Sequence, residues 1–207
     1  MRLVPFAAAP VAVSLLLAPA PLSAQSVYEL DRAASHVAFL GRAFTQRIAG
    51  RSTSLQGGVL LRGRDVRTVR GDVRFTVASI QTDPRSAQNE LTAVFGGDAH
   101  PEIIFFVDST SVEEKTRLVS LHGQLSMHGE IRPVRFDGSA HTLADGSRVV
   151  AEGVTRIDMR DWGMTPPSGL LGLVRMSPEL TLAFRAEFTQ KKRRGLASTV
   201  ARLGTRD

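Results

Sequence analysis

Alternation of apolar and polar side chains at every second position is the feature of this sequence that most restricts its fold. The clearest case is residues 68–80, whose apolar face consists of Val69, Val73, Phe75 and Val77. Residues 179–188 repeat the pattern, with Phe184 on the apolar face. A period of two is typical of a β-strand with one buried and one exposed face. Both segments are therefore predicted to be strands.

Six further segments show the same alternation less strongly. They are residues 35–43, 55–62, 103–109, 119–127, 134–136 and 147–159. Their inward positions include Val37, Phe39, Val59, Ile103, Phe105 and Leu125. A glycine at 129 in a short connection is a turn signal, so residues 116–139 are predicted to form a hairpin. About eight antiparallel strands favour a closed barrel or a sandwich, and the alternation does not choose between them.

Two segments interrupt the strand pattern. In the first, Asp83 and Pro84 predict the start of one short helix that ends by Gly96. The second, residues 164–176, contains Pro166 and Pro167 and then the three leucines Leu170, Leu171 and Leu173. It is too apolar for an ordinary exposed loop, so these leucines are expected to cover an opening. The expected fold is thus all-β with one or two short helical insertions.

The chain is expected to divide into three parts. Residues 1–24 place Arg2 before an apolar run and end in small residues at Ala20, Ser23 and Ala24, which is the order of a cleavable secretory signal peptide. Prolines interrupt this run, which argues against a membrane anchor. Residues 25–189 are expected to form one domain, since an all-β barrel of this size is commonly a single unit. Residues 190–207 are expected to be a basic, flexible tail.

Charge and cysteine content limit the kinds of binding partner and of chemistry that the sequence allows. The formal net charge is +6, but the tail carries most of the excess, and the predicted domain has equal numbers of acidic and basic residues. A nucleic-acid partner is therefore not expected, although the tail could contact anionic lipid head groups. The chain has no cysteine, so disulfides, thiolate chemistry and a lipid-modified N-terminal cysteine are excluded.

No recognisable catalytic or metal-binding motif stands out. The histidines His36, His100, His122, His128 and His141 lack the spacing of a zinc site, so no metal is expected. The sequence also lacks a Gly-x-Ser-x-Gly elbow. Arg160, Asp161 and Trp162 are the one concentrated polar group, and an ion-paired corner at a strand end explains them equally well. Neither an enzyme nor a cofactor is expected.

An ordered series of short motifs resembles the YceI-like family of exported lipid-binding proteins. The most extensive is residues 123–134, which is similar to the family's hairpin pattern G-x-L-T-h-x-G-x-T-x-P-V. Residues 28–31 and 35–39 look like its opening Y-x-I-D and S-x-V-x-F. Residues 77–82, 100–105 and 160–164 follow in the family's order as a strand end, a strand start and a D-F-G-like corner.

The resemblance implies a lipocalin-like, eight-stranded barrel with a long apolar tunnel for polyisoprenoid chains, including quinones and prenyl phosphates. The expected function is to bind and carry, or sequester, such a lipid after export to the periplasm or the exterior. The expected lining consists of Val37, Phe39, Val59, Val73, Phe75, Val77, Ile103, Phe105, Leu125 and Phe184, capped by Leu170, Leu171 and Leu173.

Alternatives remain open at this point. The barrel could instead be filled by its own side chains, as in an envelope stress or structural protein. An isoprenoid-modifying enzyme would need a polar group inside the barrel. A homodimer is also left open. Ala34, Met159 and the segment after Thr82 depart from the family pattern, which leaves the preferred lipid head group undetermined.

Overall fold

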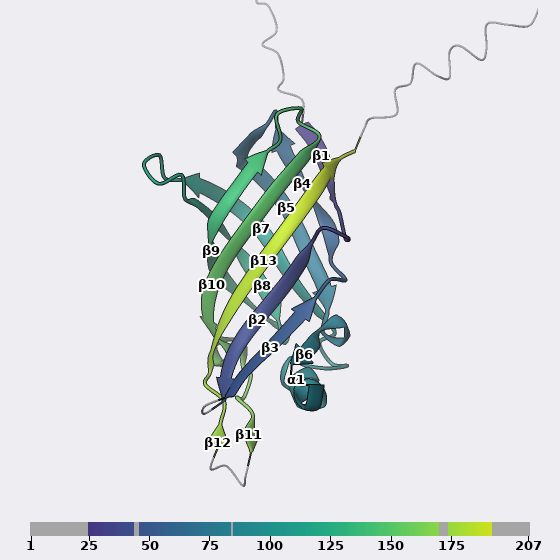
Figure 1. Ribbon diagram of the computed structural model, residues 1–207, viewed down its shortest axis with the longest axis vertical. Helices are drawn as coiled ribbons and strands as arrows, with labels where there is room; N and C mark the ends of the chain where they lie inside the picture. The colour runs from purple at the N-terminus through teal and green to yellow at the C-terminus, as the bar shows by residue number, and fades with distance from the viewer. Residues whose placement is uncertain (1–24, 44–45, 84, 170–173, 192–207) are drawn as a thin grey trace, which may run out of the picture.

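The structure is a computed structural model, and it describes residues 25–43, 46–83, 85–169 and 174–191. Eight antiparallel strands form a closed ring, which confirms the predicted barrel (Figure 1). In ring order they are β1 (Gln25–Leu30), β4 (Gln56–Arg62), β5 (Asp65–Thr76), β7 (Glu102–Val112), β8 (Val119–Met127), β9 (Glu130–Thr142), β10 (Arg148–Asp158) and β13 (Glu179–Gln190). Pairing of β1 with β13 completes the ring.

Two strands share one edge of β13. β1 pairs with the C-terminal part of β13, where Leu30 is opposite Phe188. β2 (His36–Ala43) pairs with the N-terminal part of β13, where His36 is opposite Arg185. β3 (Gln46–Ser52) and β6 (Gln81–Asp83) extend the sheet beyond β2. The ring has eight strands as predicted, but the whole sheet has eleven, and residues 25–30 and 46–52 were not predicted as strands.

The two ends of the barrel differ. The upper end, at the top of Figure 1, holds the start of β1, the end of β13 and the β4–β5 and β9–β10 turns. The lower end holds the α-helix α1 (Gln88–Val94), the 3-10 turns η1 (Val77–Ser79), η2 (Arg85–Ala87) and η3 (Met159–Trp162), and the short strands β11 (Ser168–Gly169) and β12 (Val174–Arg175) (Figure 1).

The helical insertion is confirmed, with two corrections to its surroundings. Asp83 ends β6, and Ala87 is the N-cap of α1, so the α-helix begins later than predicted. Val77 was predicted to continue the strand of residues 68–80, but β5 ends at Thr76 and Val77 begins η1. The Val77 amide donates to the Pro101 carbonyl at 2.8 Å as the chain turns toward β6.

Two groups of buried side chains fill the ends of the barrel. The upper core contains residues such as Tyr28, Leu61 and Phe188. The lower core contains Met127, Met159, Trp162, Met164, Met176, Leu180 and the buried residues of η1 and α1. Neither this α-helix nor any other helix in the described part of the chain has the length and hydropathy needed to cross a membrane.

Candidate functional site: an apolar cavity inside the barrel

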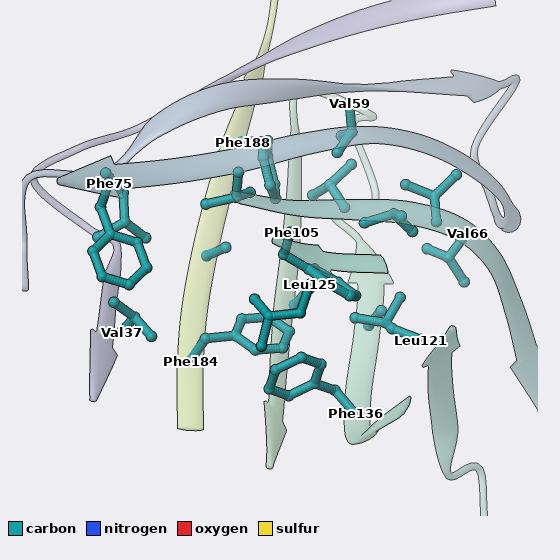
Figure 2. Close-up of a pocket in the computed structure, with 18 of the residues that line it drawn as sticks. Val37, Val59, Val66, Phe75, Phe105, Leu121, Leu125, Phe136, Phe184 and Phe188 are labelled. Carbon is teal, nitrogen blue, oxygen red and sulfur yellow. The ribbon is translucent and has the colours of Figure 1, made fainter. Parts of the chain in front are cut away.

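The main cavity lies inside the ring and has a volume of about 90 Å³. Seven strands of the ring supply lining side chains, because alternate residues of each strand point inward. Every lining residue is apolar: Val37, Leu55, Val59, Val66, Val69, Val73, Phe75, Ile103, Phe105, Val107, Leu121, Leu125, Phe136, Ala140, Val149, Ala151, Phe184, Ala186 and Phe188 (Figure 2). Such a lining favours hydrocarbon over any charged ligand.

Three phenylalanines from different strands meet in the wall of the main cavity. The ring centroids of Phe105 and Phe136 are 5.1 Å apart, and those of Phe136 and Phe184 are 5.2 Å apart. Both pairs are edge-on, which is a favourable geometry for aromatic rings. Figure 2 shows these rings grouped beside Leu125. They give the cavity an aromatic, apolar wall.

A lower cavity of about 50 Å³ adjoins the main one. Five residues line both: Val37, Phe75, Ile103, Leu125 and Phe136. These five side chains therefore form a partition between the two spaces. The lower cavity is also lined by Phe39 and Phe95, whose rings are 5.2 Å apart, and by Arg51 and Ser52. The Ser52 hydroxyl is already hydrogen-bonded to that of Ser79 at 2.7 Å.

Hydrogen bonds join two turns across the upper end of the barrel. The β4–β5 turn and the β9–β10 turn lie on opposite sides of the ring, with two strands between them in each direction. Arg64 Nη1 donates to the Ala144 carbonyl at 2.6 Å, and Thr142 Oγ1 donates to the Arg64 carbonyl at 3.1 Å. The buried Tyr28 hydroxyl donates to the Gly146 carbonyl at 3.1 Å. We call this set of hydrogen bonds the upper clasp.

The lower end is closed by side-chain packing. Trp162 lies on η3 and is only 2% exposed. Met159 and Met164, which are close to it in sequence, are buried with it in the lower core. Its indole Nε1 donates to the Leu125 carbonyl at 3.0 Å. Leu125 lines both cavities, so Trp162 directly supports the partition. Asp158 and Arg160 beside it form an ion pair, consistent with a structural corner.

Charged groups gather on the outside of the barrel rather than around the main cavity. The Ser120 hydroxyl of β8 donates to Asp137 of β9 and, together with Arg135, holds the pKa of Asp137 below its ordinary value. On β2, partial burial and the nearby Arg51 lower the pKa of His36. Among the described residues, no three His, Cys, Asp or Glu side chains are close enough to hold a metal ion.

The structure brings together most of the residues predicted to line the tunnel. Val37, Val59, Val73, Phe75, Ile103, Phe105, Leu125 and Phe184 line the main cavity, and Phe39 lines the lower one. Val77 is buried in the lower core but lines neither cavity. Leu170, Leu171 and Leu173 lie outside the described residues, between β11 and β12. Whether any of these side chains touches a ligand remains a prediction.

The prediction missed several lining residues for different reasons. Leu121, Phe136 and Phe188 continue the alternation of strands that were recognised, so the same rule could have included them. Leu55 lies just before β4 and on the same face as Val59, so the alternation of residues 55–62 could also have included it. Ala140, Ala151 and Ala186 are small, and an alanine gives little indication in sequence of which way it faces.

A closed antiparallel ring around an entirely apolar cavity defines a barrel suited to holding a slim apolar ligand. Comparison with protein families gives a narrower assignment. A model of the YceI-like domain matches residues 28–188, and the chain belongs to that family. No curated protein matches the chain.

Solved structures agree on the fold. The chain is similar to BcnA of Burkholderia cenocepacia, with a TM-score of 0.63, 15% identity and coverage of 76% of this chain and 98% of that one. It is also similar to a polyisoprenoid-binding domain from Saccharophagus degradans, with a TM-score of 0.58, 15% identity and coverage of 79% of this chain and 98% of that one. The YceI protein of Campylobacter jejuni matches with a TM-score of 0.53, 17% identity and coverage of 70% of this chain and 85% of that one.

Proposed function

We propose that this protein binds and carries, or sequesters, a long isoprenoid-type lipid of the quinone or prenyl phosphate class inside its barrel. The observation that carries the proposal is the main cavity, whose described lining side chains are all apolar. Burial of a hydrocarbon chain there is favourable by roughly 25 cal/mol per Å² of apolar surface. Membership of the YceI-like family and the named binding property of the Saccharophagus degradans domain support the choice of a polyisoprenoid.

The protein acts without catalysis in this proposal. General acid–base or nucleophilic chemistry needs positioned polar groups next to the substrate, and the residues that line the main cavity are aliphatic or phenylalanine. We further propose that the protein works outside the cytoplasm, as supported by the signal-like residues 1–24. Its basic C-terminal residues would then strengthen contact with anionic membrane surfaces.

The test is mass spectrometry of organic extracts from the purified protein, comparing wild type with Phe75→Arg. Phe75 lies in the partition between the two cavities, so the variant places a guanidinium where a lipid chain would run. Wild type should release a stoichiometric isoprenoid lipid, and Phe75→Arg should release almost none. Circular dichroism checks that the variant is folded.

Phe106→Arg is the matched control. Phe106 follows a lining residue on β7 but is 39% exposed on the outer face, so its variant adds the same charge without entering the cavity. It should keep the lipid. A wild-type protein that is empty and also fails to take up added quinones or prenyl phosphates would contradict the proposal and favour a barrel filled by its own side chains.

A further inference from the structure

One hydroxyl group near the main cavity lacks a partner. Among the residues that the structure describes, Thr110 Oγ1 is the single buried side-chain oxygen or nitrogen without a hydrogen bond. Buried polar atoms in folded proteins are nearly always hydrogen-bonded, and an unpaired one destabilises the fold. A partner supplied by a bound ligand would remove this cost.

The register of β7 places Thr110 on the inner face of the barrel. β7 has an irregularity between Val107 and Ser109, and beyond it Thr110 is directly opposite Leu121 of β8. Directly opposed residues of antiparallel strands point to the same face, with Cβ atoms about 5 Å apart. Leu121 is buried and lines the main cavity. Thr110 therefore lies beside the cavity wall, toward the upper end.

The hydroxyl contrasts with everything else around the cavity. The lining of the main cavity is entirely apolar, and the Ser52 hydroxyl in the lower cavity already has its partner in Ser79. A ligand with one polar end and a long apolar chain would thus meet a single unused hydroxyl, which lies beside the lining residue Leu121. Its apolar chain would extend from there toward Phe75 and the lower cavity.

We propose that Thr110 hydrogen-bonds the polar end of the bound lipid and that this end is an uncharged oxygen, a carbonyl or a hydroxyl. A threonine hydroxyl both donates and accepts, so it suits either group. A phosphate would need cations to replace its hydration, and the described lining of the main cavity holds none. The inference rests on the proposed function and selects quinone-like or alcohol lipids over prenyl phosphates.

The test is a comparison of Thr110→Val with wild type, because valine keeps the shape of threonine and removes only the hydroxyl. The probes share one branched carbon skeleton: the alcohol geranylgeraniol, the saturated hydrocarbon phytane and the charged geranylgeranyl diphosphate. Binding to the full chain is followed by the fluorescence of Trp162, the single tryptophan, which is bonded to the cavity residue Leu125. Thr181→Val, on the outward face of β13, is the control.

Thr110→Val should weaken geranylgeraniol binding about fivefold, as expected for one lost hydrogen bond, and should leave phytane binding unchanged. The ligand-free variant should melt at the same temperature as wild type or higher. Wild type should bind the diphosphate at least about tenfold more weakly than the alcohol. Thr181→Val should change none of these values.

Three results would overturn the inference. Equal weakening of alcohol and hydrocarbon would assign Thr110 a packing role, and no change in either would show that the hydroxyl does not reach the ligand. Diphosphate binding as tight as that of the alcohol would refute an uncharged head group. In all three cases the proposed function stands. Wild type that binds neither alcohol nor hydrocarbon refutes the proposed function and this inference together.

Discussion

Single side chains on the outer surface give the barrel a dependence on pH. His36 is partly buried on β2, and desolvation, followed by the positive charges of Arg51 and Arg185, lowers its pKa from 6.5. The folded protein thus binds a proton at His36 less readily than the unfolded chain does. The free energy of unfolding is therefore unaffected by His36 above about pH 6.5, the pKa of histidine in the unfolded chain. It falls as the pH drops below that value, because the unfolded chain takes up the proton more readily.

His36→Gln should flatten this dependence. We expect the melting temperature of wild type to fall between about pH 7.5 and about pH 5.5, and the variant to lose less over the same range. Calorimetry at a series of pH values measures the difference. The exposed His141→Gln is the control for removal of a histidine. Parallel curves for wild type and His36→Gln would show that His36 does not contribute.

Residue by residue, the sequence indicates the cavity lining well only where a strand is regular. Alternation from Ile103 through Phe105 and Val107 would place Ser109 inside the barrel. The register shift before Ser109 reverses this, so Ser109 is opposite His122 on the outer face and Thr110 faces inward. A β-bulge adds one residue to one strand, and no residue type in this segment marks it. The inward position of the Thr110 hydroxyl therefore could not be predicted from the sequence.

At the scale of elements, the upper clasp links two turns that are about 80 residues apart in sequence. We expect Arg64→Ala to remove the bonds from its guanidinium and to destabilise the protein by about 1 kcal/mol, since the bonds are exposed to water. Faster amide hydrogen exchange in residues 143–147, measured by mass spectrometry, should accompany the loss. Unchanged exchange in that turn would mean that Tyr28 and Thr142 hold it without Arg64.

Elements with few apolar residues were the hardest to predict. β3 carries Gln46, Arg47 and Arg51 and only one large apolar residue, so its alternation is weak. β1 has two neighbouring large apolar side chains, Val27 facing outward and Tyr28 facing inward, so its sequence shows no clear alternation of apolar and polar residues. β3 pairs with its hairpin neighbour β2 and with β6, whereas β1 is set by pairing with β4 and β13, which lie farther away in sequence. Such long-range pairing is not encoded in local pattern.

For the whole molecule, alternation left a barrel and a sandwich equally open. The ordered motifs over residues 28–164 favoured the barrel through their resemblance to the YceI-like family, and the observed pairing of β1 with β13 confirms it. β13 is central to this architecture because it pairs with β10, β1 and β2. Removal of this one strand would leave three strands with unpaired edges.

A chain that ends at Arg175 should therefore fail to form the barrel. It lacks β13, so β10 loses eleven cross-strand partners and the ring has no closing strand. We expect far-ultraviolet circular dichroism without the cooperative thermal transition of the full chain. A chain that ends at Lys191, after β13 is complete, should melt like the full protein. A cooperative transition in the shorter chain would show that the remaining strands close without β13.

The pairing of the first described strand with the last also has a consequence for how the protein is made. While residues 25–178 leave the ribosome, β1 can pair with β4 but not with β13. The ring cannot close until residues 179–190 have been synthesised. Closure joins segments at opposite ends of the chain, and contacts of such long sequence separation form slowly. The barrel of the newly made polypeptide therefore cannot close until the last strand has been synthesised.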